Sequence, residues 1–356
     1  MTPSADLWAG VDRFIDRVSS PELASAHLIG PLVARRWRQQ GRPLPAVLAR
    51  DERRAMLSTV TAPALLRRLR DCVEGPMMIF KGPEIAARYP DGARIFGDLD
   101  VLVLDAPAAQ RDLRAAGFSE IPDPEGIYVD LHHLTPLRDP SIPLLAVEVH
   151  SAPKWPYDLK PPSASELFEA AVPSICGVPG VLAPSPEHHA LLLAAHGWEH
   201  EPLRFVRDVL DVAIAKEEVD AVELSRLARD WQIAEIWEIN RAAADALFKD
   251  GRRPRAMRIW ARHLIDTRER TVLENHLERW FSGLWGLPLQ AALRQSGRRI
   301  ARDLRPAFDE TWPAKLRRTF QALLHAFSPR SKYDELLGPA AEKGQRRNAS
   351  RRELDV

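Results

Sequence analysis

The sequence predicts an α+β fold in which a mixed β-sheet lies between a helical N-terminal segment and an all-helical C-terminal domain. Apolar residues recur at helical spacing over residues 5–70, and helical periodicity returns after Pro186. Between them, beyond Gly75, come short apolar runs bounded by glycine, proline and aspartate, a pattern typical of strands. With 356 residues, 45% hydrophobic and 28% charged, the chain has a globular composition and is long enough for more than one domain.

The expected elements follow in chain order. The N-terminal helices include an amphipathic stretch over residues 55–69. The expected strands are 77–80, 99–104, 128–131 and 144–149, with helices at 84–89 and 106–116. Closely spaced strands after a β-α-β start predict a mixed sheet with helices on one face. The C-terminal helices are expected at 187–196, 203–216, 221–231, 233–249 and 258–280.

Proline clusters and composition suggest where the units divide. We expect a helical segment at 1–70, a sheet-containing core at 71–185, a helical domain at 186–335 and a disordered tail at 336–356. No apolar run reaches membrane-spanning length, and the N-terminus lacks the basic start of a signal peptide. We therefore expect a cytoplasmic protein with no membrane partner.

The charge is balanced overall but uneven along the chain. The net charge of +1 argues against a bulk polyanion as partner, yet residues 251–330 carry 17 basic and 7 acidic side chains. Residues 1–250 carry 27 basic and 37 acidic ones. The basic segment could face nucleic acid or this acidic surface, but a solvated face is its ordinary interpretation. A nucleic-acid partner is not favoured.

Two aspartates give the first chemical signal. Asp98 and Asp100 begin an apolar run, and on an extended strand residues two apart project from the same face. Two carboxylates so close repel each other unless a cation neutralises them. Such hard oxygen ligands suit Mg²⁺ or Mn²⁺, which usually also take substrate phosphate oxygens. An acidic pair at a strand start also commonly caps a turn.

Two neighbouring motifs strengthen the metal hypothesis. Lys81-Gly82 follows an apolar strand, where the glycine lets the backbone approach a phosphate and the lysine can neutralise it. Taken by itself, Lys81 has a solvated strand end as its ordinary interpretation. Glu148 and His150 are again two residues apart, and burying Glu148 without a partner would be unfavourable. A metal shared with the two aspartates would remove this penalty, and a surface-facing edge strand would avoid it.

Together these residues resemble a known family. A strand with Lys81-Gly82, a helix, Arg94-x-x-Gly-Asp98-x-Asp100 and a later Glu148-x-His150 resemble the uncharacterised bacterial nucleotidyltransferases of the polymerase-β-like superfamily. The resemblance covers residues 60–220 or so. It implies a mixed-sheet core whose three carboxylates hold Mg²⁺ or Mn²⁺ while a nucleotidyl group passes from an NTP such as ATP to an acceptor. Most of the superfamily has Gly-Ser in the phosphate turn, so Lys-Gly fits only this subfamily.

The resemblance also assigns roles residue by residue. The metal and catalytic residues fall at Asp98, Asp100 and Glu148, with Glu148 as the base; the nucleotide-binding residues fall at Lys81, Gly82 and Arg94; accessory positions are His133, His150, His196 and Asp208. Arg94 could instead pair structurally with Asp98 or Asp100. The acceptor, whether small molecule, peptide or protein, and the oligomeric state are not predicted by any motif.

Two other functions compete with this interpretation. The first is a non-catalytic member of the fold that binds an NTP or a partner, such as an antitoxin-like or regulatory protein. The second is a zinc peptidase, because His196-x-x-Glu199-His200 spells the inverted zinc motif, with Glu274 or Glu278 as a third ligand. For His196 the ordinary alternative is a core histidine bonded to Asp208 or to a backbone carbonyl.

Overall fold

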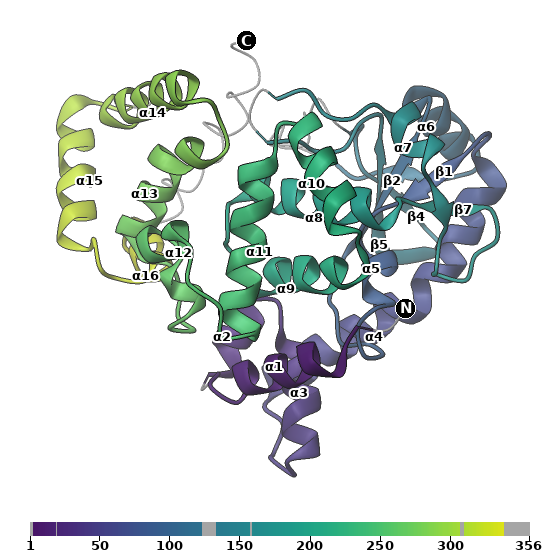
Figure 1. Cartoon of the computed structure of the whole chain (residues 1–356), viewed down its shortest axis with the longest axis horizontal. Coiled ribbons are helices and arrows are strands. Elements are labelled where there is room, and N and C mark those ends of the chain that lie inside the picture. The colour runs from purple at the N-terminus through teal and green to yellow at the C-terminus, as the bar shows by residue number, and fades with distance from the viewer. Residues whose placement is uncertain (1–2, 19, 123–132, 157–158, 307–309, 338–356) are drawn as a thin grey trace.

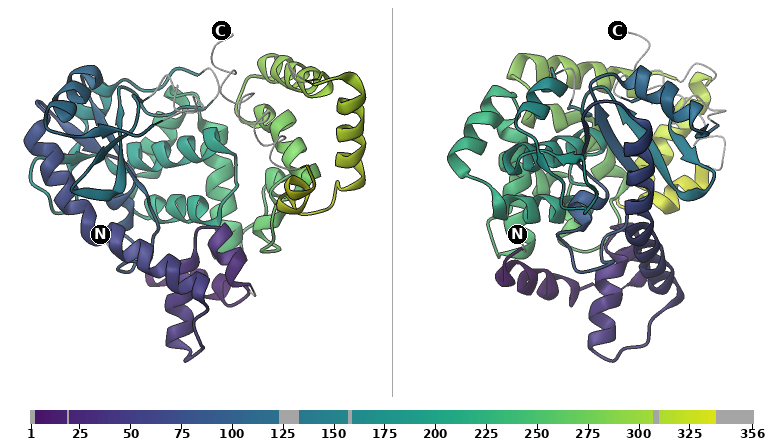
Figure 2. Two further views of the ribbon diagram at one scale, coloured as in Figure 1. Left: turned by 180° about the vertical axis from the view of Figure 1, so that it is seen from behind. Right: turned by 90° about the vertical axis from the view of Figure 1, so that its right-hand side faces the viewer.

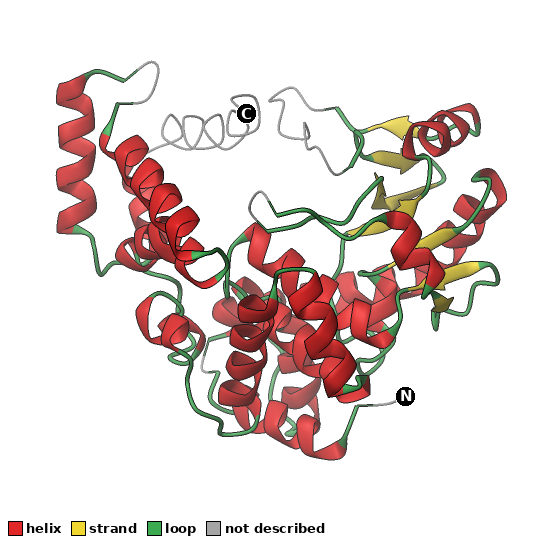
Figure 3. Cartoon of the chain, turned by 45° about the horizontal axis from the view of Figure 1, so that its top comes forward, coloured by secondary structure: helices red, strands yellow, loops and turns green. Residues whose placement is uncertain are grey.

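The sheet is the centre of the α+β fold, as predicted. The computed structural model describes residues 3–18, 20–122, 133–156, 159–306 and 310–337. Seven strands in these ranges form one mixed sheet with the order β3-β4-β5-β2-β1-β7-β6 (Figure 3). The strands are β1 (Met77–Ile79), β2 (Asp98–Val103), β3 (Ser119–Glu120), β4 (Leu137–Asp139), β5 (Ile142–His150), β6 (Val172–Pro173) and β7 (Val181–Ala183).

Three of the predicted strands are confirmed with shifts of one or two residues at their ends. They are β1, β2 and β5, and the fourth predicted strand, 128–131, lies outside the described residues. The centre of the sheet has β2 between β1, which is antiparallel to it, and β5, which is parallel. The two strands that carry the acidic motifs are therefore direct neighbours.

Helices cover both faces of the sheet, so the prediction of helices on one face is wrong. Alternate side chains of β2 pack against α4 (Ala46–Cys72) and α6 (Ala106–Ala115). The opposite face, with Met78 and Leu102, belongs to a second core that includes α8 (Pro186–His200) and α9 (Val206–Ala215) (Figure 1). The chain beyond Pro186 turns back over the sheet because this face is apolar too. Asp98 and Asp100 lie on it, since they alternate with residues of the first core.

The N-terminal helices belong to the same core as the C-terminal ones. They are α1 (Ala5–Ile15), α2 (Pro21–Ala26) and α3 (Gly30–Gln39), and they lie beneath α11 (Ala234–Phe248) (Figures 1 and 2). Phe14 meets Phe248 edge to face, with ring centroids 5.6 Å apart. A Cβ added at Gly10 would lie 1.9 Å from the Phe248 carbonyl oxygen, so only glycine permits this approach. One apolar core thus contains residues from both sides of each expected domain boundary, after residue 70 and after residue 185. The division into domains stays a prediction.

The long helix predicted over 258–280 is wrong. The structure has α12 (Arg255–Ile259), a 3₁₀ turn η2 (Arg262–Leu264) and then α13 (Val272–Phe281). Thr267 has a φ of 44°, which no helix interior accommodates. Thr271 then starts α13 through a capping box with Glu274.

The remaining elements complete the two sides of the molecule. They are α5 (Pro83–Ala86), α7 (Ala164–Glu169), η1 (Lys216–Glu218), α10 (Ala221–Asp230), η3 (Ser282–Trp285), α14 (Leu289–Leu304), α15 (Trp312–Leu324) and α16 (Arg330–Leu337). Helices α13–α16 lie on the side of the molecule away from the sheet (Figure 1). The expected tail begins within α16, and residues 338–356 lie outside the described ranges. None of the described helices combines the length and apolar composition needed to cross a bilayer.

Candidate active site

The parallel pairing of β2 with β5 brings the acidic residues together. Asp100 stands opposite Glu148 in the ladder, and Leu102 stands opposite His150. Asp98, two residues before Asp100, projects from the same face and is half-buried. Asp100 and His150 are buried, whereas the Glu148 side chain keeps 22% of its surface exposed. The face of the sheet therefore presents a buried acid and a more accessible one beside each other.

Three of these side chains form a group that could hold a metal ion. Asp100, Glu148 and His150 each offer a ligand atom, and the three atoms lie within 4.8 Å of one another. Nε2 of His150 is 3.2 Å from Oδ1 of Asp100 and 3.7 Å from Oε2 of Glu148. The group contains two of the three predicted metal ligands, with His150 in the third place. Asp98 lies outside it, on the same face of the strand.

The donor set fits a divalent cation. Oδ2 of Asp100 is buried and accepts no hydrogen bond from any residue in the described ranges. The nearest cationic atom paired with it is Nζ of Lys81, at 3.7 Å. A buried carboxylate oxygen without a donor is unfavourable unless a cation compensates it. Two carboxylates and one imidazole suit Mn²⁺, and the carboxylates suit Mg²⁺.

The charges of the site keep it acidic. Burial opposes ionisation of Asp100, but Lys81 and then His150 hold the pKa of its carboxyl well below the usual range. Burial favours a neutral His150 ring, yet contacts with Asp100 and Glu148 raise the pKa of His150 to about 9. For Asp98, burial and then the charge of Asp100 raise the pKa. Without a metal, His150 is therefore protonated at neutral pH and lies against both carboxylates.

The Lys81-Gly82 turn lies directly beside these carboxylates. Gly82 has a φ of 54°, and a Cβ there would lie 3.0 Å from the Asp98 carbonyl oxygen. Nζ of Lys81 is 2.7 Å from Nε2 of His196. Because an ammonium group only donates, the His196 ring accepts there as the neutral form. His189 contacts Phe80, the residue just before the turn, since its Nε2 lies 2.7 Å from the Phe80 carbonyl oxygen. Helix α8 thus holds the turn through two histidines.

Arg94 does not occupy either of its predicted places. It pairs with neither Asp98 nor Asp100, and its guanidinium is buried rather than open to a nucleotide. Its Nε and Nη2 donate to the two carboxylate oxygens of Asp211 on α9, at 2.8 and 2.6 Å. A further contact of 3.4 Å joins Nη1 to the Gly82 carbonyl oxygen. Burial opposes the charge, but Asp211 raises the pKa of Arg94. Arg94 therefore links α9 to the Lys81-Gly82 turn and helps to position that turn.

Of the other accessory residues, His133 lies against His150 and Asp208 pairs with Arg207. His133 forms an isolated bridge with His150, and their ring centroids are 5.4 Å apart. Asp208 accepts hydrogen bonds from Nε and Nη2 of Arg207, at 3.0 and 2.8 Å. Arg207 also acts electrostatically on Asp98, whose pKa it lowers against the larger effects of burial and Asp100. Arg207 is a second cation at the site that sequence reasoning missed, because nothing distinguished it from the surface arginines.

The described members of the zinc motif and its predicted third ligands are engaged elsewhere, including Glu278, which pairs with Arg270 at 3.8 Å. His196 directs Nε2 to Lys81, and Glu274 is engaged by Arg268 and the Thr271 cap. The side chain of His200 lies outside what the structure describes. In the part of the chain that the structure describes, the three side chains close enough together to hold a metal are those of Asp100, Glu148 and His150. The geometry therefore does not support the peptidase hypothesis.

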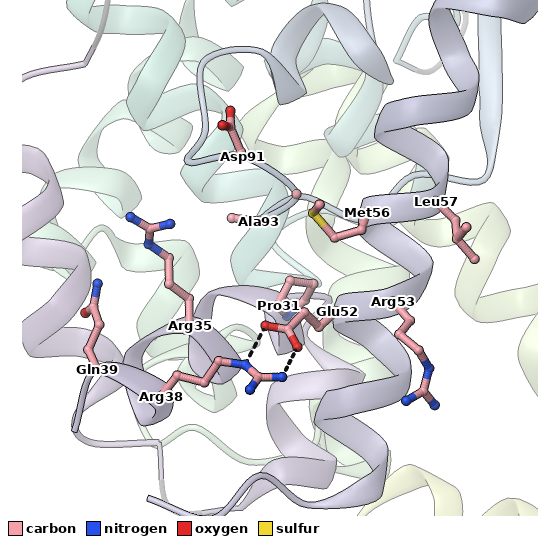
Figure 4. Close-up of a pocket in the computed structure, with 11 residues that line it drawn as sticks. Pro31, Arg35, Arg38, Gln39, Glu52, Arg53, Met56, Leu57, Asp91 and Ala93 are labelled. Atoms are coloured by element: carbon pink, nitrogen blue, oxygen red, sulfur yellow. Dashed lines mark hydrogen bonds and ion pairs between the residues drawn. The ribbon is translucent and has the colours of Figure 1, made fainter. Parts of the chain in front are cut away.

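A pocket of about 800 Å³ lies elsewhere, between α3, α4 and the loop at 91–93 (Figure 4). None of the predicted site residues lines it. Its arginines are partly neutralised, because Arg38 makes two hydrogen bonds to Glu52, at 3.0 and 2.7 Å. This pocket is therefore separate from the acidic residues of the sheet.

Comparison with known proteins settles the family. Residues 21–249 match a family described as uncharacterised nucleotidyltransferases. The match spans more than half of the chain and includes both strands that carry the acidic residues. The chain belongs to this family. The resemblance inferred from Lys81-Gly82, Asp98-x-Asp100 and Glu148 is thereby confirmed, and membership supports a transferase that uses nucleoside triphosphates. No curated protein and no solved structure matches this chain.

Proposed function

We propose that this nucleotidyltransferase moves a nucleotidyl group from an NTP to an acceptor, with Mg²⁺ or Mn²⁺ bound at Asp98, Asp100 and Glu148. The observation that carries the proposal is the buried Oδ2 of Asp100, which has no hydrogen-bond donor in the described ranges and lies 3.7 Å from Lys81. Family membership supplies the reaction class. The acceptor is a small molecule, a peptide or a protein.

The different exposure of the carboxylates suits them to different roles. Asp100 is buried and kept ionised, so it suits a permanent ligand, while the half-buried Asp98 extends the acidic face of the sheet. A bound divalent ion would supply neutralisation of triphosphate charge and of the pyrophosphate that leaves. Glu148 is more accessible than Asp100, so it can take the proton from an attacking acceptor hydroxyl.

The basic residues neutralise the substrate. Lys81 lies at the turn where Gly82 lets the backbone come close to a phosphate. Arg207 adds a second positive charge near Asp98, and it takes over the role first expected of Arg94. His196 and Asp208 hold these two cations in place.

A second candidate is a member that binds an NTP without transferring it. It is favoured by His150, whose protonated ring lies against Asp100 and Glu148 and compensates their charge without a metal. The two candidates differ in whether NTP binding needs a divalent cation.

The first experiment measures thermal stabilisation by each NTP with Mg²⁺, with Mn²⁺ and with chelator. A ligand at about 100 times its Kd stabilises the folded state by about 2.7 kcal/mol. We expect a metal-dependent rise in Tm that the Asp98→Asn/Asp100→Asn double variant loses. Asp112→Asn, an exposed carboxylate of α6, is the matched control and should respond like wild type.

The outcomes separate the candidates. A metal-dependent shift justifies a search for the acceptor with NTP labelled at the α-phosphorus. A shift that persists in chelator favours non-catalytic binding. No shift with any NTP, from a folded protein, overturns the proposed function.

A further inference from the structure

Helix α15 turns its apolar side away from the protein. Its large apolar side chains, with Phe327 just beyond its end, are between 60% and 83% exposed: Trp312 60%, Leu316 64%, Phe320 62%, Leu323 70%, Leu324 67% and Phe327 83%. On the opposite side of the helix, Lys315 is only 8% exposed, and its ammonium donates to the Asp303 carbonyl oxygen. Arg318 donates to Glu310 at 2.8 Å on the same inward side. The usual orientation of an amphipathic helix is reversed.

The six exposed side chains, which we call the α15 stripe, form one continuous surface. Within α15 the steps of three and four residues from Trp312 to Leu324 keep these side chains on one side of the helix. At 1.5 Å per residue this helical part of the stripe is about 18 Å long. Single exposed apolar residues are ordinary, but a contiguous stripe of this size marks an interaction surface. Helix α15 lies at the outer edge of the molecule, where a second molecule can reach it (Figures 1 and 2).

We propose that the α15 stripe is the interface of a homodimer, in which α15 packs antiparallel against α15 of a second copy across a two-fold axis near Phe320. Apolar side chains flank that residue on both sides. Leu316 and Leu324 lie four residues to either side, and Trp312 and Phe327 lie eight and seven residues away. In an isologous interface a residue i that contacts j is matched by j contacting i, so Phe320 meets Phe320 at the axis and Leu316 meets Leu324.

The size of the stripe suits a dimer. An aromatic side chain buries about 150–250 Å² when it is fully covered. Two copies bring six aromatics to the interface, so even with partial prior burial they approach the roughly 1,000 Å² that a specific interface needs. The leucines add to this area, and Leu304 at the end of α14, 57% exposed, can extend it.

The orientation of the basic side chains on α15 itself favours a second copy over a lipid surface. Helices that lie in a membrane interface direct Lys and Arg to the head groups. Here Lys315 and Arg318 face the protein instead. Arg317 stands at the edge of the stripe, and across the axis the two copies of it are separated by about 9 Å along the helix.

The test is the mass of the full chain in solution, measured by light scattering and sedimentation across a wide range of concentration. We expect a monomer–dimer equilibrium that Phe320→Asp weakens by roughly 30-fold or more, the effect of losing a central interface aromatic. Val222→Asp, an 81% exposed apolar residue of α10, is the control and should dimerise like wild type. A chain that is monomeric throughout, or a dimer indifferent to Phe320→Asp, overturns the proposal.

A second variant tests the axis itself. Phe320→Cys near a two-fold axis should give a disulfide-linked dimer under mild oxidation, above the background of Cys72 and Cys176 in wild type. Val222→Cys should not. Monomers that instead bind anionic vesicles through the stripe would overturn the dimer in favour of a lipid surface. The inference is independent of the proposed function, since α15 lies outside the matched residues 21–249.

Discussion

Gly82 joins the phosphate turn to the strand that carries the aspartates. Its φ of 54° is left-handed, and a Cβ there would lie 3.0 Å from the Asp98 carbonyl oxygen. Gly82→Ala should therefore push the turn away from Asp98, besides the backbone penalty of about 1–2 kcal/mol for a left-handed residue. We expect the NTP-dependent rise in Tm to be lost. Gly41→Ala is the control, because Gly41 has a φ of 66° and open space around it. Equal NTP responses from the two variants would refute a positioning role for Gly82.

At this scale the sequence predicted the acidic residues but not the buried ion pair that holds the neighbouring turn in place. Spacing of two residues placed Asp98 with Asp100 and Glu148 with His150, because strand geometry fixes which side chains share a face. The buried pairing of Arg94 was not predictable, since Asp211 lies 117 residues away in the sequence. Such a contact depends on how α9 packs on the sheet, which no local pattern encodes.

At the scale of elements, His189 ties α8 to the end of β1. Burial, and next the charge of Arg88, lower the pKa of His189 to about 3 from an ordinary 6.5. The folded state therefore keeps this ring neutral, while the unfolded chain takes up a proton once the pH falls below about 6.5. Stability is fully present at neutral pH and falls as the pH drops toward 3. Between pH 7 and pH 5 the loss from this residue is about 2 kcal/mol.

The variant His189→Gln isolates this contribution. Its amide can still donate to the Phe80 carbonyl oxygen, but it cannot take up a proton. Denaturant unfolding at pH 7 and pH 5 should show a drop about 2 kcal/mol smaller in the variant than in wild type. His325→Gln, on a partly exposed histidine after α15, should leave the drop unchanged. Equal drops in wild type and His189→Gln would contradict a neutral buried ring.

Elements with a strong apolar period were predicted well, and short or interrupted ones were not. Strands β1, β2 and β5 are continuous apolar runs. Strands β3 and β6 are only two residues long and exposed, so they show no hydrophobic pattern that could predict them. The break before α13 was missed because a positive φ at Thr267 has no clear sequence signal. Tertiary contacts, rather than propensity, decide such segments.

At the scale of the whole molecule, the helices of both chain ends share one core with the sheet. Residues of α1, β2 and α11 belong to a single apolar cluster, although they are separated by most of the chain. The sequence predicted a helical segment, a core and a helical domain, because composition changes at Gly75 and Pro186. It did not predict that the first and last of these pack together. Cooperative unfolding is the expected consequence of one shared core.

The variant Phe14→Ala tests whether this core is one unit. Phe14 is 1% exposed and packs on Phe248, so its truncation should lower stability by about 3–5 kcal/mol. We expect a single transition at lower denaturant, seen equally by tryptophan fluorescence and by loss of NTP-dependent stabilisation, because the site rests on the same cluster. Leu57→Ala, at a half-exposed position of α4, should change stability by less than about 1 kcal/mol. Two transitions, of which Phe14→Ala shifts only one, would show instead that the N-terminal helices unfold as a separate unit.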